Sequence, residues 1–199
     1  MSRIRTKIGG AAGALALAAG SVGATALPAQ ADGSSDGGDP FPYRNGTVRA
    51  HGGLIAHASP STHSPVTSTY HNGAKVKIDC KVDGPNIKGN DTWYLLPGEG
   101  PMWVSARYVE NNGRAPGYCN PNDGYFTGHA TARLNQRAGA NVADAKVGQY
   151  AQGQRVHVGC WTESSSNHKW YFTNQGRWVS ADYVAITDEV RYCSMHLAP

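Results

Sequence analysis

The aromatic residues are the side chains of this sequence that are best suited to recognition chemistry. The chain of 199 residues contains five tryptophans and ten tyrosines, and the first of these fifteen is Tyr43. Flat rings that end in a polar atom can stack on sugars or on peptide backbone at a low cost in conformational entropy. We expect a ligand-binding groove to use rings that point away from the core: Tyr70, Tyr94, Tyr150, Trp161 and Tyr171.

Catalytic chemistry has little support in the sequence. The zinc-protease motif H-E-x-x-H does not occur, and the fourteen acidic residues are scattered without a spacing that pairs two of them. A cysteine nucleophile requires a free thiol, and four cysteines that form two disulfides would leave none. We therefore predict that the protein is not an enzyme and that it has no cofactor.

The eight histidines do not form a metal-binding pattern. His51, His57, His63 and His71 are separated by 6, 6 and 8 residues, whereas side chains on one face of a strand recur at every second residue. The four cysteines contain no C-x-x-C pair, the spacing that places two thiolates on one ion. We therefore expect no metal site. We expect the histidines to lie in loops, exposed to solvent.

The N-terminus is typical of an exported protein. Arg3, Arg5 and Lys7 precede an uncharged stretch rich in Ala, Gly and Leu, and residues 29–31 (Ala-Gln-Ala) resemble a signal-peptidase site. The low hydrophobicity of the stretch argues against a membrane anchor. Three of the 18 basic residues lie in this segment, so the chain beyond residue 31 has 15 basic and 14 acidic side chains. This balance disfavours binding to nucleic acid, which needs a concentrated basic face.

An internal repeat organises the remaining sequence. At an offset of 80, Tyr70, Gly73 and Cys80 align with Tyr150, Gly153 and Cys160. Shorter offsets then align "WVSA" at residues 103–106 with the same letters at 178–181, and Cys119 with Cys193. Matched blocks joined by loops of different length predict two copies of one small domain.

Each copy predicts β-strands. Apolar and polar residues alternate over 75–80 and again over 155–160, which is typical of a half-buried strand. Asn72-Gly73 and Gln152-Gly153 predict a turn before each of these strands. Four further rings are expected in the core: Trp103, Trp178, Tyr108 and Tyr183.

The cysteines occur twice in each copy at matching places. Pairing Cys80 with Cys119 and Cys160 with Cys193 closes loops of similar length, although four cysteines allow three connectivities. A copy of about 70 residues has a thin core, so a disulfide that contributes about 3–4 kcal/mol would matter to its stability.

Three ordered blocks in each copy resemble the bacterial SH3-like (SH3b) domain, a small β-barrel of exported cell-envelope proteins. In the second copy they are "RLNQRAGANVADAKVGQYAQGQRVHV" (133–158), "KWYF" (169–172) and "GRWVSADYV" (176–184). The first copy is more divergent: "GLIAHASPSTHSPVTSTYHNGAKVKI", "TWYL" and "PMWVSARYV". In the family the leading block contributes to the ligand groove, so the resemblance adds Asn135 and Arg137 to the binding residues. His57 takes the place of Arg137 in the first copy.

The resemblance implies an all-β chain of two tandem SH3-like barrels, each with one disulfide. The expected organisation is a signal peptide (1–31), a leader (32–46), domain 1 (47–119), a linker (120–128), domain 2 (129–193) and a tail (194–199). The implied function is a secreted protein, associated with the cell wall, that binds peptidoglycan or its peptides. The alternative is an extracellular protein-interaction module that inhibits or adapts another secreted protein. Two weak sites on one chain would raise the apparent affinity for a polymeric wall.

Overall fold

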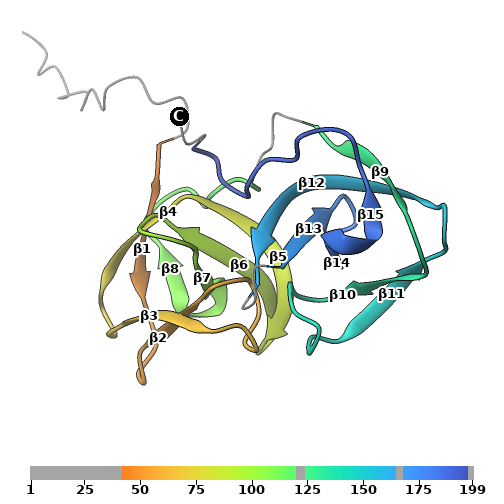
Figure 1. The fold of residues 1–199 in the computed structure, drawn as a ribbon. Helices are drawn as coiled ribbons and strands as arrows, with labels where there is room; N and C mark the ends of the chain where they lie inside the picture. The colour runs from red at the N-terminus through yellow and green to blue at the C-terminus, as the bar shows by residue number, and fades with distance from the viewer. Residues whose placement is uncertain (1–41, 120–123, 165–167, 197–199) are drawn as a thin grey trace, which may run out of the picture. The chain divides into compact units, whose positions relative to one another are not determined.

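A computed structural model describes residues 42–119, 124–164 and 168–196, which belong to one compact unit. Within these residues the chain consists of antiparallel β-strands and two 3-10 turns (Figure 1). The all-β prediction is confirmed. The expected signal peptide lies outside the described residues. No helix among the described residues is long and apolar enough to cross a membrane.

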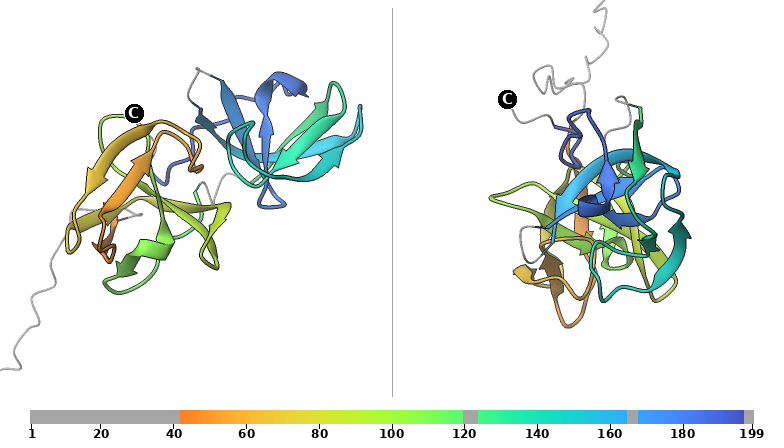
Figure 2. Two further views of the ribbon diagram at one scale, coloured as in Figure 1. Left: turned by 90° about the horizontal axis from the view of Figure 1, so that it is seen from below. Right: turned by 45° about the vertical axis from the view of Figure 1, so that its right-hand side comes forward.

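The two halves repeat one order of elements. The first half contains β1 (Arg44–Val48), β2 (Leu54–His57), β3 (Val66–Tyr70), β4 (Lys75–Ile78), β5 (Cys80–Ile87), β6 (Asn90–Leu96), β7 (Met102–Ser105), η1 (Ala106–Tyr108) and β8 (Val109–Asn111). The second half contains β9 (Phe126–Ala130), β10 (Leu134–Arg137), β11 (Lys146–Tyr150), β12 (Arg155–Glu163), β13 (Lys169–Thr173), β14 (Trp178–Ser180), η2 (Ala181–Tyr183) and β15 (Val184–Ala185). Figure 2 shows how the strands of each half curl.

A single residue makes the sheets of the two halves differ. The second half forms one sheet of order β11-β10-β14-β13-β12-β9-β15. In the first half Asp79 interrupts the strand that corresponds to β12, which leaves β4-β1-β8 and β3-β2-β7-β6-β5 as separate sheets. The equivalent residue in β12 is Gly159, where the pairing with β13 shifts register but the strand continues.

The expected alternation and turns are present. Val76 and Ile78 are buried while Lys75 and Lys77 are exposed. The turn before β4 uses Gly73 at φ +85° and the turn before β12 uses Gly153 at φ +78°, a backbone conformation that glycine adopts without steric cost. The strands extend beyond the expected domain boundaries, because β1 begins inside the predicted leader and β9 inside the predicted linker.

The buried apolar side chains form three clusters. One belongs to the first half and contains Tyr94 and Val104. One belongs to the second half and contains Tyr150 and Val179. The third, here called the interface cluster, draws on both halves: Cys80, Val82, Trp93, Leu95, Trp103, Cys119, Ala140, Cys160, Trp170, Phe172, Trp178 and Cys193. The halves therefore share a core.

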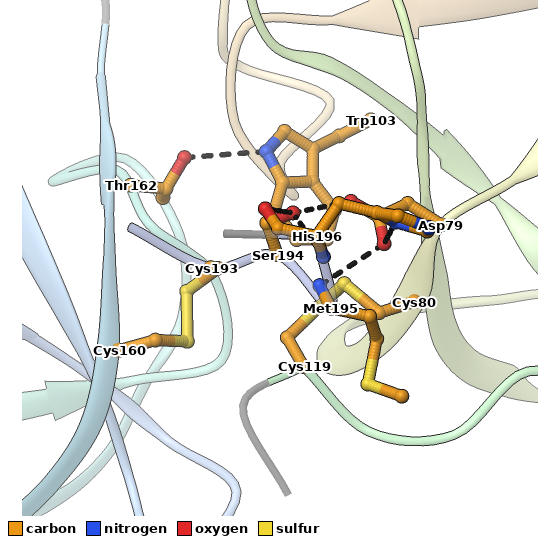
Figure 3. The surroundings of a disulfide bond; sticks show 10 residues. All are labelled: Asp79, Cys80, Trp103, Cys119, Cys160, Thr162, Cys193, Ser194, Met195 and His196. Carbon is orange, nitrogen blue, oxygen red and sulfur yellow. Dashed lines mark hydrogen bonds and ion pairs between the residues drawn. A yellow bond between two sulfur atoms is a disulfide. The ribbon is translucent and has the colours of Figure 1, made fainter. Parts of the chain in front are cut away.

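Both disulfides lie in the interface cluster. Cys80 bonds Cys119 and Cys160 bonds Cys193, with Cα atoms 5.0 and 4.9 Å apart, which confirms the pairing within copies. Figure 3 shows both bonds and the contact made by Trp103.

Hydrogen bonds across the interface cluster follow the repeat. The indole N–H of Trp103 donates to the Thr162 hydroxyl over 3.2 Å, and that of Trp178 donates to the Asp83 carbonyl over 2.8 Å. Because Trp103 and Trp178 are equivalent in the repeat, the two halves contact each other through related surfaces, as the subunits of a two-fold dimer do.

Candidate functional site

An open groove combines aromatic and charged side chains from both halves. It has a volume of about 1160 Å³ and lies between the segment that follows β6, the strand β12 and the residues around the second disulfide. Its aromatic and titratable lining residues are Tyr43, Phe126, Trp161, Tyr192, Asp79, Glu163, Glu189, Arg191 and His196. Rings beside charges of both signs can hold a ligand that has apolar and ionic parts.

Trp161 is the predicted site residue that lines this groove. It lies on β12 directly opposite Tyr171 of β13. Tyr192 meets the indole edge-on at 5.1 Å between ring centroids, and the Lys169 ammonium lies 4.2 Å from the ring centroid. Burial raises the pKa of the Tyr192 phenol, which is neutral at physiological pH with or without this shift. The indole is thus held from two sides and carries a cation on its face.

Three lining residues, Asp79, Ser194 and His196, belong to a clamp between the C-terminal residues and the first half (Figure 3). The Asp79 carboxylate is almost fully buried and accepts hydrogen bonds from the Ser194 hydroxyl at 2.6 Å and the Met195 amide at 3.0 Å. His196 Nδ1 lies 2.8 Å from the same carboxylate, and Tyr43 stacks on the imidazole at 3.9 Å. Residues 194–196, predicted to be a tail, are therefore part of the fold.

Two predicted site residues are buried, and their expected outward orientation is wrong. Tyr94 is 5% exposed and Tyr150 is 2% exposed. For Tyr94 the reason is that β6 is covered on both faces: Trp93 enters the interface cluster while Tyr94 enters the core of its own half. Tyr150 lies on β11, and its ring enters the core of the second half. The Tyr94 hydroxyl accepts a hydrogen bond from Asn111 inside the fold.

Tyr70 and Tyr171 are half-buried rings that pack against the cores of their halves. The Tyr70 hydroxyl donates to the Met102 sulfur at 3.4 Å. Burial raises the pKa of the Tyr171 phenol. Tyr171 neighbours Trp161 across the strand pair, whereas Tyr70 belongs to the other half, so the structure brings only one of these two tyrosines to Trp161.

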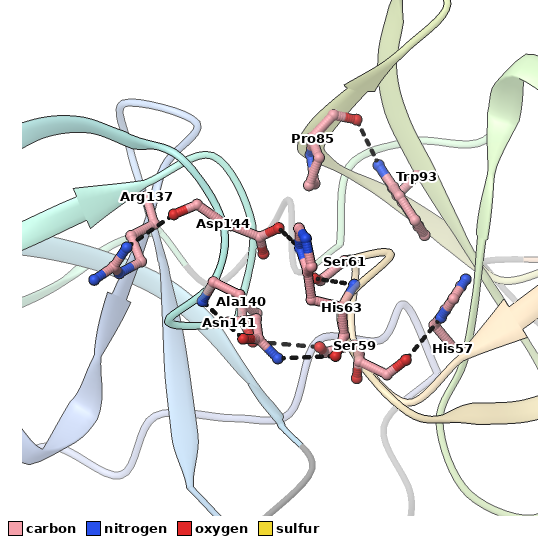
Figure 4. A network of polar contacts seen from close by, with 12 residues as sticks. His57, Ser59, Ser61, His63, Pro85, Trp93, Arg137, Ala140, Asn141 and Asp144 are labelled. Carbon is pink, nitrogen blue, oxygen red and sulfur yellow. Dashed lines mark hydrogen bonds and ion pairs between the residues drawn. The ribbon is translucent and has the colours of Figure 1, made fainter.

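The residues that the family resemblance added are engaged within the protein. Asn135 accepts a hydrogen bond from the Gln149 amide on the β10–β11 hairpin. Arg137 donates to the Asp144 carbonyl at 2.8 Å and so supports the loop that contacts the first half (Figure 4). Their ligand-binding role stays a prediction, at places separate from the groove.

Two further expectations are corrected. Tyr183, expected in the core, is 50% exposed, and η2, on which it lies, has no buried residue. His57, expected to be exposed, lies on β2 at 8% exposure with its ring nitrogen 2.9 Å from the Ser64 carbonyl.

Over the part of the chain that the structure describes, no group of three or more His, Cys, Asp or Glu is placed to hold a metal ion.

Sequence reasoning missed Asp79, Tyr43, Tyr192 and His196. Tyr192 had a signal, because it directly precedes Cys193 as Tyr118 precedes Cys119. Asp79 stands where the second copy has Gly159, a difference that alignment of the copies displays but whose meaning depends on the C-terminal residues that contact it.

The comparisons with known proteins give only distant structural resemblances. No protein-family model matches the sequence. No curated protein matches it either. Among solved structures, the chain is similar to the CBD of endolysin LysPBC5, with 12% identity, a TM-score of 0.30 and coverage of 75% of this chain and 97% of that one.

Two other solved structures are similar over part of their length. NlpC2 from Trichomonas vaginalis is 9% identical with a TM-score of 0.28, and the match covers 75% of this chain and 50% of that one. An autolysin from Listeria monocytogenes is 17% identical with a TM-score of 0.25, covering 74% and 64%. This chain thus spans about half the length of the Trichomonas protein. None of these similarities carries an argument about function.

Proposed function

We propose that this protein is a secreted, non-catalytic binding protein that recognises cell-wall peptidoglycan or its peptides in the groove beside Trp161. The observation that carries the proposal is the groove itself, in which an indole supported by Tyr192 lies among Glu163, Glu189 and Arg191. The two disulfides are consistent with an oxidising, extracellular compartment.

The chemistry of the groove fits a wall peptide. Such peptides carry free amino and carboxylate groups between short apolar side chains. Glu163 and Glu189 can pair with the amino groups of such a peptide, and the indole of Trp161 provides an apolar surface. Asp79 already accepts hydrogen bonds from the C-terminal residues, so we assign it to holding the groove together rather than to acid–base chemistry.

The groove is composite, which changes the expected number of sites. Its lining comes from both halves, including Pro97 and Pro101 of the first and Trp161 of the second. We therefore propose one wall-binding groove per chain, in place of the two equivalent sites that tandem repeats suggest.

Sedimentation with purified Gram-positive sacculi tests the proposal. The oxidised protein is expected to pellet with the sacculi, and Trp161→Ala is expected to weaken retention by about two- to tenfold, since an aromatic contact contributes about 0.5–1.5 kcal/mol. Glu189→Lys reverses the charge of an exposed side chain in the groove without disturbing the core. It is expected to weaken retention as well. Tyr183→Ala, an exposed tyrosine outside the groove, is the matched control.

The opposite results are equally informative. If the protein stays in the supernatant at low salt, the wall-binding proposal fails and a secreted protein partner becomes the better explanation. If incubation releases soluble muropeptides, the protein is catalytic and the non-catalytic part of the proposal is wrong.

A further inference from the structure

Three strands of the second half repeat the arrangement of the sheet β4-β1-β8 of the first half. The strands β12, β9 and β15 lie side by side in that order (Figure 1). The amide of Val48 donates to the Ala74 carbonyl in the first half, and the amide of Ala130 donates to the Gln154 carbonyl in the second, both at 2.9 Å. These matched bonds align β1 with β9, so the two surfaces can be compared position by position.

The solvent side of the second-half strands carries basic side chains. His129 lies directly opposite Arg155 on β12 and opposite Ala185 on β15, and Thr127 lies opposite His157. Residues opposite each other in an antiparallel pair point to the same side of the sheet, with Cβ atoms about 4.5–5.5 Å apart. All of them are exposed except His157, which is half-buried. This surface, here called the basic face, consists of Thr127, His129, Arg155, His157 and Ala185.

The corresponding surface of the first half contains an acid. Thr47 takes the place of His129, opposite Lys75, and Glu110 takes the place of Ala185. The Lys75 ammonium donates to the Thr47 hydroxyl at 2.8 Å. The Glu110 carboxylate accepts a hydrogen bond from an arginine side chain at 2.6 Å. The first half therefore uses its charged groups within the fold.

The basic side chains of the second half are not paired in this way. Among the described residues, no side-chain hydrogen bond or ion pair involves His129 or Arg155. The ring nitrogen of His157 lies 3.3 Å from the hydroxyl of Thr127, a neutral group. The basic face thus presents an arginine and two imidazoles without a carboxylate of its own.

The acidic residues that flank β15 lie outside the basic face. Asp182 is on η2, where its carboxylate lies 3.4 Å from the ring nitrogen of His168. Asp188 and Glu189 follow β15, and Glu189 lines the groove. The residues that line the groove include none of the basic face, so the two surfaces are separate.

We infer that the basic face binds an anionic polymer whose charge is carried by phosphodiester groups. The guanidinium of Arg155 and the N–H groups of the imidazoles are suitable donors for phosphate oxygens. Histidine gains charge between about pH 8 and pH 5, whereas a phosphodiester stays charged over this range, so mild acid strengthens the attraction. A nucleic acid fits less well, because single strands stack their bases on aromatic rings and the basic face has no Trp, Tyr or Phe. The cell wall as the source of the polymer rests on the proposed function.

Calorimetric titration of the oxidised protein with polyglycerol phosphate at low ionic strength tests the inference. Arg155→Ala is expected to weaken binding by about two- to fivefold, the size of one exposed ion pair. Ala185→Glu gives the basic face the carboxylate that Glu110 provides in the first half and is expected to weaken binding by about fivefold. Lys75→Ala, at the position that corresponds to Arg155, is the matched control and is expected to leave binding unchanged.

The pH dependence of the same titration tests the two histidines. The unaltered protein is expected to bind polyglycerol phosphate more tightly at about pH 5.5 than at about pH 7.5, because both imidazoles gain charge. The double variant His129→Gln, His157→Gln keeps Arg155 and is expected to lose most of this difference. A difference that is as large in the double variant would contradict the role of the histidines.

The inference is overturned if polyglycerol phosphate does not bind, or if Arg155→Ala and Ala185→Glu bind it as tightly as the unaltered protein. It is also overturned if polyglutamate, single-stranded DNA or vesicles of phosphatidylglycerol bind more tightly than polyglycerol phosphate. Sacculi stripped of anionic polymers separate the inference from the proposed function. Retention on stripped sacculi without binding of polyglycerol phosphate contradicts the inference alone. Binding of polyglycerol phosphate through Arg155 without retention on stripped sacculi contradicts the proposed groove alone.

Discussion

At the scale of single residues, Asp83 is a carboxylate whose environment disfavours its charge. Burial is the main cause of its raised pKa, and Asp91 adds to it. A carboxyl group with a folded pKa above its unfolded value holds its proton longer in the native state. The free energy of unfolding therefore falls as pH rises through the window just above 3.8, and the loss persists at neutral pH.

Asp83→Asn is expected to remove this dependence. The amide keeps a hydrogen-bond acceptor for Tyr118 but cannot ionise. The stability of the variant relative to the unaltered protein should therefore increase between pH 3 and pH 6, as measured by urea unfolding at each pH. Asp188→Asn, at an exposed position, is the control. A relative stability of Asp83→Asn that decreases over this range would contradict the assignment.

At the scale of elements, the repeat predicted the strands well because their alternation is local. Val76 and Ile78 face a core that their own half provides. The alternation of apolar and polar residues and the turn at Gly73 therefore suffice to place β4. Tyr94 could not be placed in the same way. Tyr94 enters the core of its own half because the opposite face of β6, which carries Trp93, enters the interface cluster, and that cluster joins residues far apart in the sequence.

The candidate site was less predictable than the strands. Trp161 was recognised because it has no aromatic counterpart in the first copy, where Lys81 stands. Tyr43, Asp79 and His196 come together only when the C-terminal residues fold back onto the break between β4 and β5, which local patterns do not encode. Tyr150 was misplaced because its large ring fills the core of its half rather than a surface.

The break between β4 and β5 makes its own prediction. Asp79 leaves the strand pattern and accepts hydrogen bonds from Ser194 and Met195. Asp79→Ala removes the acceptor that the Met195 amide and the Ser194 hydroxyl share, so it is expected to lower the free energy of unfolding by about 1–3 kcal/mol. Urea denaturation measures the change, and Ser194→Ala, which removes one of the donors, should cost less. A change in Asp79→Ala of only a few tenths of a kcal/mol would show that the clamp does not contribute to stability.

At the scale of the whole molecule, the interface cluster turns two repeats into one cooperative unit. Independent modules joined by a linker would unfold in two transitions. Here both disulfides and the buried indoles of Trp103 and Trp178 belong to one cluster shared by the halves, so unfolding one half exposes apolar surface of the other. The oxidised protein is therefore expected to unfold in one calorimetric transition, with a van't Hoff enthalpy equal to the calorimetric enthalpy.

A substitution at the shared cluster separates cooperative unfolding from two transitions that merely coincide. Trp103→Phe keeps most of the apolar volume but removes the indole N–H that donates to Thr162 in the other half. If the halves unfold together, the variant should lower the midpoint of the whole transition and leave it single. If the midpoint of only one half moves and a second transition emerges at the original temperature, the halves are energetically independent. In that case the composite groove, which needs both halves in place, could open without global unfolding.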